Sequence, residues 1–174
     1  MIASITDRVE RALLVCFVDL SAYSVDTERV GHDAAIADFL DRWYERIHDA
    51  VCGSSGSVVK FIGDGALLVW PTTLADAAMD ALLALRAEMD QALAEAGWSS
   101  RVFVRVHAGP VIAGEYGGRF AKRFDVIGRT VNVAARLPTR GVTLSPHAYR
   151  LLSAAGKERF KRFTPPVTYV PADE

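Results

Sequence analysis

Residues 58–70 read V-V-K-F-I-G-D-G-A-L-L-V-W, two short apolar runs on either side of a Gly-Asp-Gly sequence. An Asp-Gly pair between two strand-like runs is a strong signal for a β-hairpin. The runs therefore predict strands over residues 58–62 and 66–70, with Pro71 ending the second strand. This hairpin would carry the carboxylate of Asp64 at its tip.

An apolar run and an amphipathic segment precede the hairpin. Residues 12–18 are all apolar and too few for a typical helix, so they predict a buried strand. Between about His32 and Cys52 the apolar residues recur every three or four positions, which predicts an amphipathic helix that Gly53 ends. Residues 20–24, between the strand and this helix, predict a loop.

The alternation of strand and helix continues after the hairpin. An apolar stripe over residues 74–96 predicts a second helix, and residues 102–108 predict a strand that Gly109-Pro110 ends. The resulting order, β-α-β-β-α-β, is typical of a ferredoxin-like fold, an antiparallel sheet with two helices on one face. We therefore expect an α+β protein with a ferredoxin-like core, additional strands and a single domain over residues 1–174.

Shorter elements complete the predicted architecture. We expect an exposed loop or hairpin tip over residues 114–123, because this stretch holds a Gly-Gly pair and three basic residues. Short strands are expected over residues 124–127, 142–144 and, as an edge strand with prolines, 163–170. Helices are expected over residues 130–137 and 146–153.

The composition argues against several classes of protein. Of the 174 residues, 51% are apolar and 24% are charged, which suits a packed globule rather than a disordered chain. A net charge of −1 disfavours a sequence-independent nucleic-acid binder. The longest apolar run is far shorter than the roughly 20 residues of a membrane span, so direct membrane insertion is not expected. Cys16 and Cys52 form no metal or disulfide motif, which favours a reducing, cytoplasmic compartment.

Two acidic residues occupy places where cations can be held. Asp19 directly follows the first predicted strand, and this strand and the hairpin are neighbours in a ferredoxin-like sheet. Two carboxylates at neighbouring strand ends supply the oxygen ligands that divalent cations prefer, and a helix N-terminus just after Asp19 would attract phosphate. Spacing alone leaves the alternative open that Asp19 and Asp64 are ordinary turn residues.

The segment over residues 124–137 reads F-D-V-I-G-R-T-V-N-V-A-A-R-L and carries two polar groups on its predicted helix. Asn132 and Arg136 are four residues apart, so both project from one face of that helix. Neither belongs to the apolar stripe of the helix. This face therefore presents an amide and a guanidinium to a ligand or a partner.

Five blocks, in order, resemble the catalytic domain of the class III nucleotide cyclases, the adenylate and guanylate cyclases. They are V-C-F-V-D-L-S-A-Y-S at 15–24, the hairpin at 58–70, V-H-A-G-P-V-I-A-G at 106–114, the block at 124–137 and G-V-T-L-S-P-H-A-Y-R-L-L at 141–152. The resemblance extends over about residues 13–170. It implies a ferredoxin-like core with extra strands, in agreement with the order of the predicted elements.

The resemblance implies roles for four charged residues. Asp19 and Asp64 match the two metal-binding aspartates of the family, which implies two divalent cations, Mg²⁺ or Mn²⁺. Lys60 and Asp125 match the pair that selects the purine. Adenine offers an acceptor at N1 and a donor at its amino group, and these suit a lysine and an ionised aspartate, so ATP is favoured over GTP. The alternative is that Lys60 forms a surface ion pair with Asp64.

The resemblance also implies an enzyme and its reaction. Asn132 matches the residue that orients the ribose, and Arg136 matches the arginine that stabilises the transition state. The reaction is attack of the ribose 3′-oxygen on the α-phosphate of ATP, which gives 3′,5′-cyclic AMP and pyrophosphate. In the family the two cations assist this attack, and the arginine neutralises charge that grows on the phosphoryl oxygens.

The chain departs from the family pattern at several positions. The loop expected to bind the phosphates consists of Leu20, Ser21, Ala22, Tyr23 and Ser24, and the family usually has Gly-Phe in place of Ala22-Tyr23. Alanine has less backbone freedom than glycine, so this loop is more restricted.

Further departures concern basic residues. On the strand before His107, Phe103 stands where the family has arginine and Arg105 stands where it has glycine, and we hypothesise that Arg105 contacts the triphosphate. Lys161 resembles a lysine that reaches the β- and γ-phosphates. No role is assigned to Arg129, which replaces an acidic or amide residue.

The resemblance implies a second copy of the chain as a partner. In the family, the metal aspartates come from one catalytic domain and the purine pair, the asparagine and the arginine from the other. A chain with both sets implies a head-to-tail homodimer with ATP in two equivalent sites. Two alternatives remain. One is a degenerate domain that binds nucleotide or dimerises to regulate a partner, and the other is a guanylate cyclase.

Overall fold

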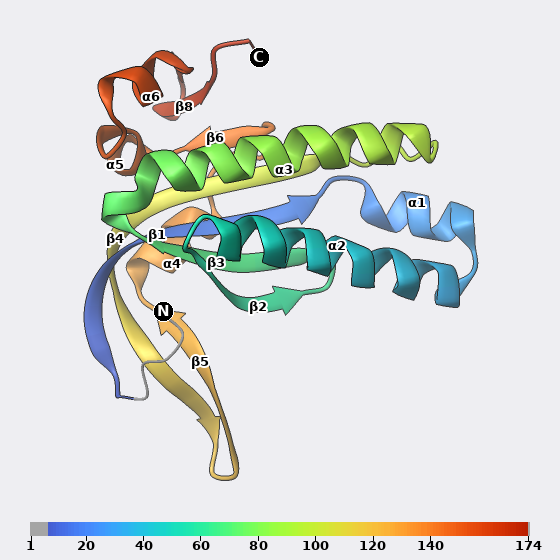
Figure 1. The fold of residues 1–174 in the computed structure, drawn as a ribbon, viewed down its shortest axis with the longest axis horizontal. Coiled ribbons are helices and arrows are strands. Elements are labelled where there is room, and N and C mark those ends of the chain that lie inside the picture. The colour runs from blue at the N-terminus through green and yellow to red at the C-terminus, as the bar shows by residue number, and fades with distance from the viewer. Residues whose placement is uncertain (1–6, 174) are drawn as a thin grey trace.

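The computed structural model describes residues 7–173, which fold into one eight-stranded sheet with helices against both faces (Figure 1). The strand order is β2-β3-β1-β4-β6-β8-β7, and β5 pairs with β4 outside this path. The strands are β1 (Val9–Leu20), β2 (Ser57–Ile62), β3 (Gly65–Pro71), β4 (Val102–Gly118), β5 (Ala121–Ile127), β6 (Val142–Leu144), β7 (Phe160–Phe163) and β8 (Thr168–Pro171). The helices are α1 (Tyr23–Val30), α2 (Asp33–Gly53), α3 (Ala75–Glu95), α4 (Arg129–Ala135), α5 (Pro146–Arg150) and α6 (Ala154–Glu158).

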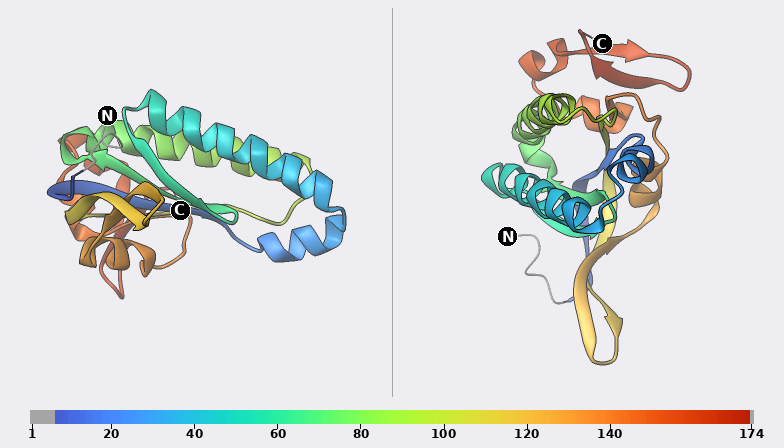
Figure 2. Two further views of the ribbon diagram at one scale, coloured as in Figure 1. Left: turned by 90° about the horizontal axis from the view of Figure 1, so that it is seen from below. Right: turned by 90° about the vertical axis from the view of Figure 1, so that its right-hand side faces the viewer.

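The first four strands and the two long helices form the predicted ferredoxin-like core. β1 pairs antiparallel with β3 on one side and with β4 on the other, and β2 pairs antiparallel with β3. The helices α2 and α3 cover one face of the sheet, and α4 packs against the other (Figure 2). The predicted fold class is therefore confirmed. Within residues 7–173, no helix has the length and apolar character needed to cross a membrane.

The uninterrupted apolar run of β1 follows from cover on both of its faces. Alternate side chains of a strand point to opposite faces of the sheet. Leu14 and Cys16 pack in the cluster under α2 and α3, whereas Leu13 and Val15 pack in the cluster that includes α4. A strand with two buried faces needs no alternation of polar and apolar residues.

The strand β4 is longer than predicted, because Gly109-Pro110 does not end it. Pro110 lies opposite Ala12 of β1 and falls between the parts of β4 that pair with β6 and with β5. On the side of β4 that faces away from β1, none of the described strands lies opposite Pro110. A backbone N–H at this position would therefore have no strand to donate to, and proline is tolerated. At Gly109, a Cβ would lie 2.6 Å from Oγ1 of Thr130, whose hydroxyl donates to the Pro110 carbonyl.

Several shorter elements also differ from prediction. Over residues 114–123, β4 and β5 continue as a hairpin that projects from the body (Figure 1). The single edge strand predicted over residues 163–170 is wrong, since two strands, β7 and β8, pair there. The helix predicted over residues 146–153 is shorter, because α5 ends at Arg150 and Ser153 caps a separate helix, α6. The helix α4 ends at Ala135, two residues earlier than predicted.

The helix α1 is not predicted by the sequence. Its eight residues, Y-S-V-D-T-E-R-V, carry no apolar stripe, and Val25 is 62% exposed. The buried residue of this helix is the charged Asp26. Polar contacts rather than an apolar face therefore hold α1 in place.

Candidate active site

The two predicted metal-site aspartates lie together. Oδ1 of Asp19 and Oδ2 of Asp64 both accept from the backbone N–H of Leu20, at 3.1 and 3.2 Å. The close approach depends on Gly65, where a Cβ would lie 2.9 Å from the carbonyl oxygen of Val18. The hairpin tip thus reaches the end of β1, as the ferredoxin-like arrangement predicts.

The environment of this carboxylate pair suits a cation. Burial raises the pKa of Asp19, and the hydrogen bond and negative charge of Asp64 raise it further, to about 6. Two ionised carboxylates this close repel each other, and a bound divalent cation between them removes the repulsion. Two protein carboxylates also fit an ion such as Mg²⁺, whose other ligands are commonly water and substrate phosphates. The donor set therefore fits the cations that the resemblance implies.

Two side chains of α2 donate hydrogen bonds to the tip of the β2–β3 hairpin. The indole N–H of Trp43, which is fully buried, donates to the carbonyl oxygen of Asp64 at 2.8 Å. The hydroxyl of Tyr44 donates to the carbonyl oxygen of Gly63, and its ring stacks on Phe61 at 4.0 Å. The apolar stripe of α2 predicts Trp43 as a core residue but gives no signal for these contacts.

The predicted phosphate loop is a tight turn that leads from β1 into α1. Ala22 stands at the N-cap of α1 with a φ of 53°, in the left-handed region. A left-handed conformation costs a residue with a Cβ roughly 1 kcal/mol, so the family's glycine would suit this position better. Two hydrogen bonds of 2.8 Å hold the turn: the N–H of Ser21 donates to the carbonyl oxygen of Arg101, and the N–H of Arg101 donates to Oγ of Ser21. The N-terminus of α1 follows immediately, and its N–H groups favour an anion.

The predicted purine pair is formed within the chain. Nζ of Lys60, on β2, lies 2.6 Å from Oδ2 of Asp125, on β5. Lys60 therefore pairs with Asp125 and not with Asp64. Beside the pair lies an open hollow of about 650 Å³, whose lining includes Phe61, Tyr116 and Phe124.

The predicted ribose and transition-state residues lie at the end of α4. Asn132 and Arg136 are both exposed, and Nε of Arg136 donates to the carbonyl oxygen of Asn132 at 3.2 Å. Arg136 follows the last helical residue, and its side chain reaches back to the backbone of Asn132 although the helix is shorter than predicted.

Arg105 connects the carboxylate pair to the end of α4. Its Nη2 lies 3.5 Å from Oδ2 of Asp19, and its Nη1 donates to the carbonyl oxygen of Ala135 at 2.7 Å. The side chain is 14% exposed, and its buried Nε has no hydrogen-bond partner among the described residues. Arg105 therefore lies beside the candidate metal site, where a triphosphate would meet it.

Lys161 lies apart from the other predicted residues. It is on β7, the strand at the far end of the sheet order from β2. Its Nζ donates to the carbonyl oxygen of Ala172 at 3.2 Å. The chain does not bring it to the carboxylate pair.

The predicted residues thus form two groups in one chain. The first contains the carboxylate pair, the turn over residues 20–24 and Arg105. The second, which the family resemblance defines, contains the pair Lys60 and Asp125 and the pair Asn132 and Arg136; within the described part of the chain, no hydrogen bond or ion pair joins these two pairs. Among residues 7–173, no hydrogen bond or ion pair joins the side chains of the second group to the carboxylate pair.

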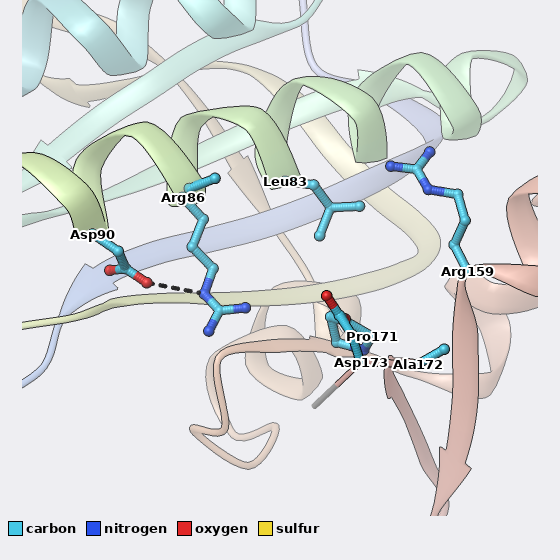
Figure 3. A pocket seen from close by; sticks show the side chains of 8 residues that line it. Leu83, Arg86, Asp90, Arg159, Pro171, Ala172 and Asp173 are labelled. Carbon is cyan, nitrogen blue, oxygen red and sulfur yellow. Dashed lines mark ion pairs between the residues drawn. The ribbon is translucent and has the colours of Figure 1, made fainter.

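A further hollow, of about 640 Å³, lies between α3 and the C-terminal hairpin (Figure 3). Nε of Arg86 lies 3.4 Å from Oδ2 of Asp90 there, and Arg159 pairs with Asp80. None of the predicted site residues lines this hollow, so it is separate from the candidate site.

Comparison with known proteins decides the family. Residues 11–165 match the family model described as the adenylate and guanylate cyclase catalytic domain. The chain belongs to this cyclase family. It is 29% identical over 166 residues to adenylate cyclase 2 of Rhizobium meliloti (strain 1021), a match that covers 91% of this chain and 44% of that protein.

Other relatives of this cyclase-family chain are less informative. It is 32% identical over 132 residues to an uncharacterized protein of Mycobacterium tuberculosis (strain ATCC 25618 / H37Rv), a match that covers 74% of this chain and 24% of that protein. The chain therefore spans less than half the length of these curated relatives.

Solved structures confirm the cyclase fold. A bacterial light-regulated adenylyl cyclase superposes with a TM-score of 0.84 at 20% identity, covering 97% of this chain and 54% of that one. The adenylyl cyclase CyaB from P. aeruginosa gives 0.82 at 19% identity, with 97% of each chain covered. The guanylyl cyclase Cya2 gives 0.77 at 17% identity, with 93% and 91% covered. Both nucleotide specificities thus occur on this fold.

Proposed function

We propose that this chain is an adenylate cyclase, which converts ATP to 3′,5′-cyclic AMP and pyrophosphate in the cytoplasm. The observation that carries the proposal is the preformed ion pair between Lys60 and Asp125, at 2.6 Å beside an open hollow. Nζ of Lys60 can donate to N1 of adenine, and Asp125 can accept from the amino group. Guanine presents the reverse pattern and would leave both groups unpaired.

Each remaining residue has a defined task in the proposed reaction. Asp19 and Asp64 would hold two divalent cations, Mg²⁺ or Mn²⁺, which lower the pKa of the ribose 3′-hydroxyl and neutralise the polyphosphate when bound. The turn over residues 20–24, at the N-terminus of α1, would receive the phosphates together with Arg105. Asn132 would orient the ribose.

Charge develops on the α-phosphate oxygens as the 3′-oxygen attacks. The guanidinium of Arg136 would neutralise this charge and so stabilise the transition state. Arg136 suits this task because it is exposed at the end of a helix and its Nε donates a hydrogen bond to the carbonyl oxygen of Asn132. The arginine and the asparagine therefore approach the substrate as one unit.

The two groups of residues support a composite site between two copies of the chain. In a head-to-tail dimer, the carboxylate pair of one copy would face the second group of the other, which gives two equivalent sites. Exposed apolar side chains support such a partner, since Phe61, Ile62 and Ile127 lie at the surface and Phe120 at the tip of the projecting hairpin is 93% exposed. In this proposal residues 1–174 act as one catalytic domain, and Lys161 contacts phosphate only within the dimer.

A second candidate function is a degenerate cyclase domain that binds nucleotide or dimerises without turnover. The left-handed Ala22 favours it, because strain in the phosphate-binding turn lowers the fit to substrate. The full set of metal, purine, ribose and transition-state residues favours the enzyme.

The assay that separates these functions measures cyclic nucleotide formed from ATP and from GTP, with Mg²⁺ and with Mn²⁺, at several protein concentrations. We expect cyclic AMP as the main product, with a specific activity that rises with protein concentration as dimers form. Cyclic GMP as the main product would contradict the purine assignment. No product from a proven dimer would favour the degenerate domain.

The purine pair gives a prediction of its own. The double variant Lys60→Glu with Asp125→Cys should raise the ratio of GTP to ATP turnover at least about tenfold, because the reversed donor and acceptor pattern now suits guanine. Arg123→Gln, which changes the lining of the same hollow but not the pair, is the matched control. An unchanged ratio in the double variant would remove the pair as the determinant.

A further inference from the structure

In the connection between α3 and β4, each of residues 97–101 contacts α1 or the turn before it. Nη2 of Arg29, on α1, donates to the carbonyl oxygen of Gly97 at 2.7 Å. The ring of Trp98 lies 6.3 Å from that of Tyr23 and stacks on Phe39 of α2 at 4.3 Å. The remaining three positions bind the same region through hydrogen bonds.

Asp26 is the centre of these hydrogen bonds. It is 2% exposed, and its carboxylate accepts from the backbone N–H groups of Ser99 and Ser100 at 2.9 and 2.8 Å. The hydroxyl of Ser100 donates to it at 2.6 Å and that of Ser99 at 3.2 Å. Burial alone would raise the pKa of Asp26, but these hydrogen bonds outweigh it and lower the pKa to about 2. The Asp26 carboxylate is therefore ionised at neutral pH.

The turn before α1 is tied to the same connection. The N–H of Ser21 donates to the carbonyl oxygen of Arg101, and the N–H of Arg101 donates to Oγ of Ser21. Ser21 precedes the left-handed Ala22, and Asp26 follows it by four residues. Both sides of this strained turn are thus held by one segment of chain.

These contacts determine where the N-terminus of α1 points. The one side chain of α1 that packs against the core is the partly buried Tyr23, at the first turn of the helix, so the orientation of α1 depends largely on polar contacts. Without these contacts, Ala22 is free to leave the strained left-handed region. The turn would then lose the geometry in which the N–H of Leu20 donates to both carboxylates and the N-terminus of α1 follows directly.

We propose that Asp26 is a positioning residue for polyphosphate binding, which acts by clamping α1 and the turn over residues 20–24 to Ser99 and Ser100. This inference rests on the proposed function, in which that turn receives the phosphates of ATP. Asp26 itself is buried away from the substrate, so its effect is on phosphate affinity and not on recognition of the base.

The test uses Asp26→Asn, which keeps the shape of the side chain but removes its charge and replaces one of its two acceptor oxygens by an N–H donor among the donors of Ser99 and Ser100. Binding of Mg²⁺-tripolyphosphate and of adenosine is measured by titration calorimetry, and KM for ATP and kcat are measured in parallel. We expect about a tenfold loss of tripolyphosphate affinity and a similar rise in KM, with adenosine affinity unchanged and kcat at saturation changed less than about threefold.

Asp76→Asn is the matched control. Asp76, on α3, accepts from the N–H and the hydroxyl of Ser153, both at 3.1 Å, and lies outside the candidate site. It should lower the thermal midpoint without loss of tripolyphosphate affinity. Should Asp26→Asn fail to fold, Ser100→Ala removes one hydroxyl of the same clamp and should weaken tripolyphosphate binding in the same direction.

Three outcomes overturn the inference. They are wild-type tripolyphosphate affinity in folded Asp26→Asn, an equal loss in Asp76→Asn, and no tripolyphosphate binding by the wild type. Failure of the proposed function looks different. If the wild type forms no cyclic nucleotide but Asp26→Asn still weakens tripolyphosphate alone, the positioning role stands and the cyclase proposal falls.

Discussion

Asp19→Ala is expected to lower kcat/KM for ATP at least about 10³-fold, and Asp64→Ala should do the same, because each removes one of the two carboxylates proposed to hold the cations. The loss should not come from unfolding. In the protein without metal, Asp64 raises the pKa of Asp19 together with burial, so removal of either carboxylate relieves repulsion. The measurement is the initial rate of product formation beside a thermal melt and a Mn²⁺ titration.

The control for this experiment is Asp80→Ala. Asp80 is an exposed carboxylate on α3 that pairs with Arg159 outside the candidate site. It should leave both the rate and the Mn²⁺ affinity close to those of the wild type. A carboxylate-pair variant that retains a tenth of wild-type activity would contradict the metal assignment.

Arg136→Ala is expected to lower kcat about 10²–10³-fold with little change in KM, because the guanidinium meets charge that exists only in the transition state. Truncation should leave the fold intact, since the side chain is exposed and donates to a backbone carbonyl four residues earlier. Steady-state kinetics over a range of ATP concentrations separates the two parameters. Arg129→Ala, an exposed arginine at the start of the same helix, is the matched control. A raised KM with unchanged kcat would instead place Arg136 in ground-state binding.

The core of the fold could be predicted because its signals are local. The Asp-Gly hairpin, the apolar run of β1 and the two amphipathic helices each lie within one stretch of sequence. The helix α1 could not be predicted, because what orders it is a buried carboxylate whose partners, Ser99 and Ser100, lie more than 70 residues away. The same holds for β4, where the absence of a partner strand beside Pro110 is a property of the sheet and not of the local sequence.

The members of the candidate site are predictions from the family resemblance, and their contacts could not be predicted from the sequence. The family resemblance supplies Asp19, Asp64, Lys60 and Asp125, yet the pairing of Lys60 with Asp125 depends on how β2 and β5 approach across the sheet. The bonds from Trp43 and Tyr44 to the hairpin tip have no sequence signal either, because both residues are typical of the buried or half-buried side of any amphipathic helix.

Arg105 shows the limit of prediction from resemblance. The family pattern places glycine there, so it gives no role to an arginine. Its contacts with Asp19 and with the Ala135 carbonyl appear only once β4 and α4 are packed together. The structure places Arg105 between the carboxylate pair and the end of α4, and its contact with the triphosphate stays a prediction.

The most direct test of the composite site is to mix two inactive variants, Asp19→Ala and Arg136→Ala. Each mixed dimer would hold one site with both defects and one site with neither. Random exchange of subunits in an equal mixture should therefore restore about a quarter of wild-type cyclic AMP formation. If mixed dimers are shown to form and no activity returns, the two groups of residues do not meet across a dimer, and the proposed site is wrong.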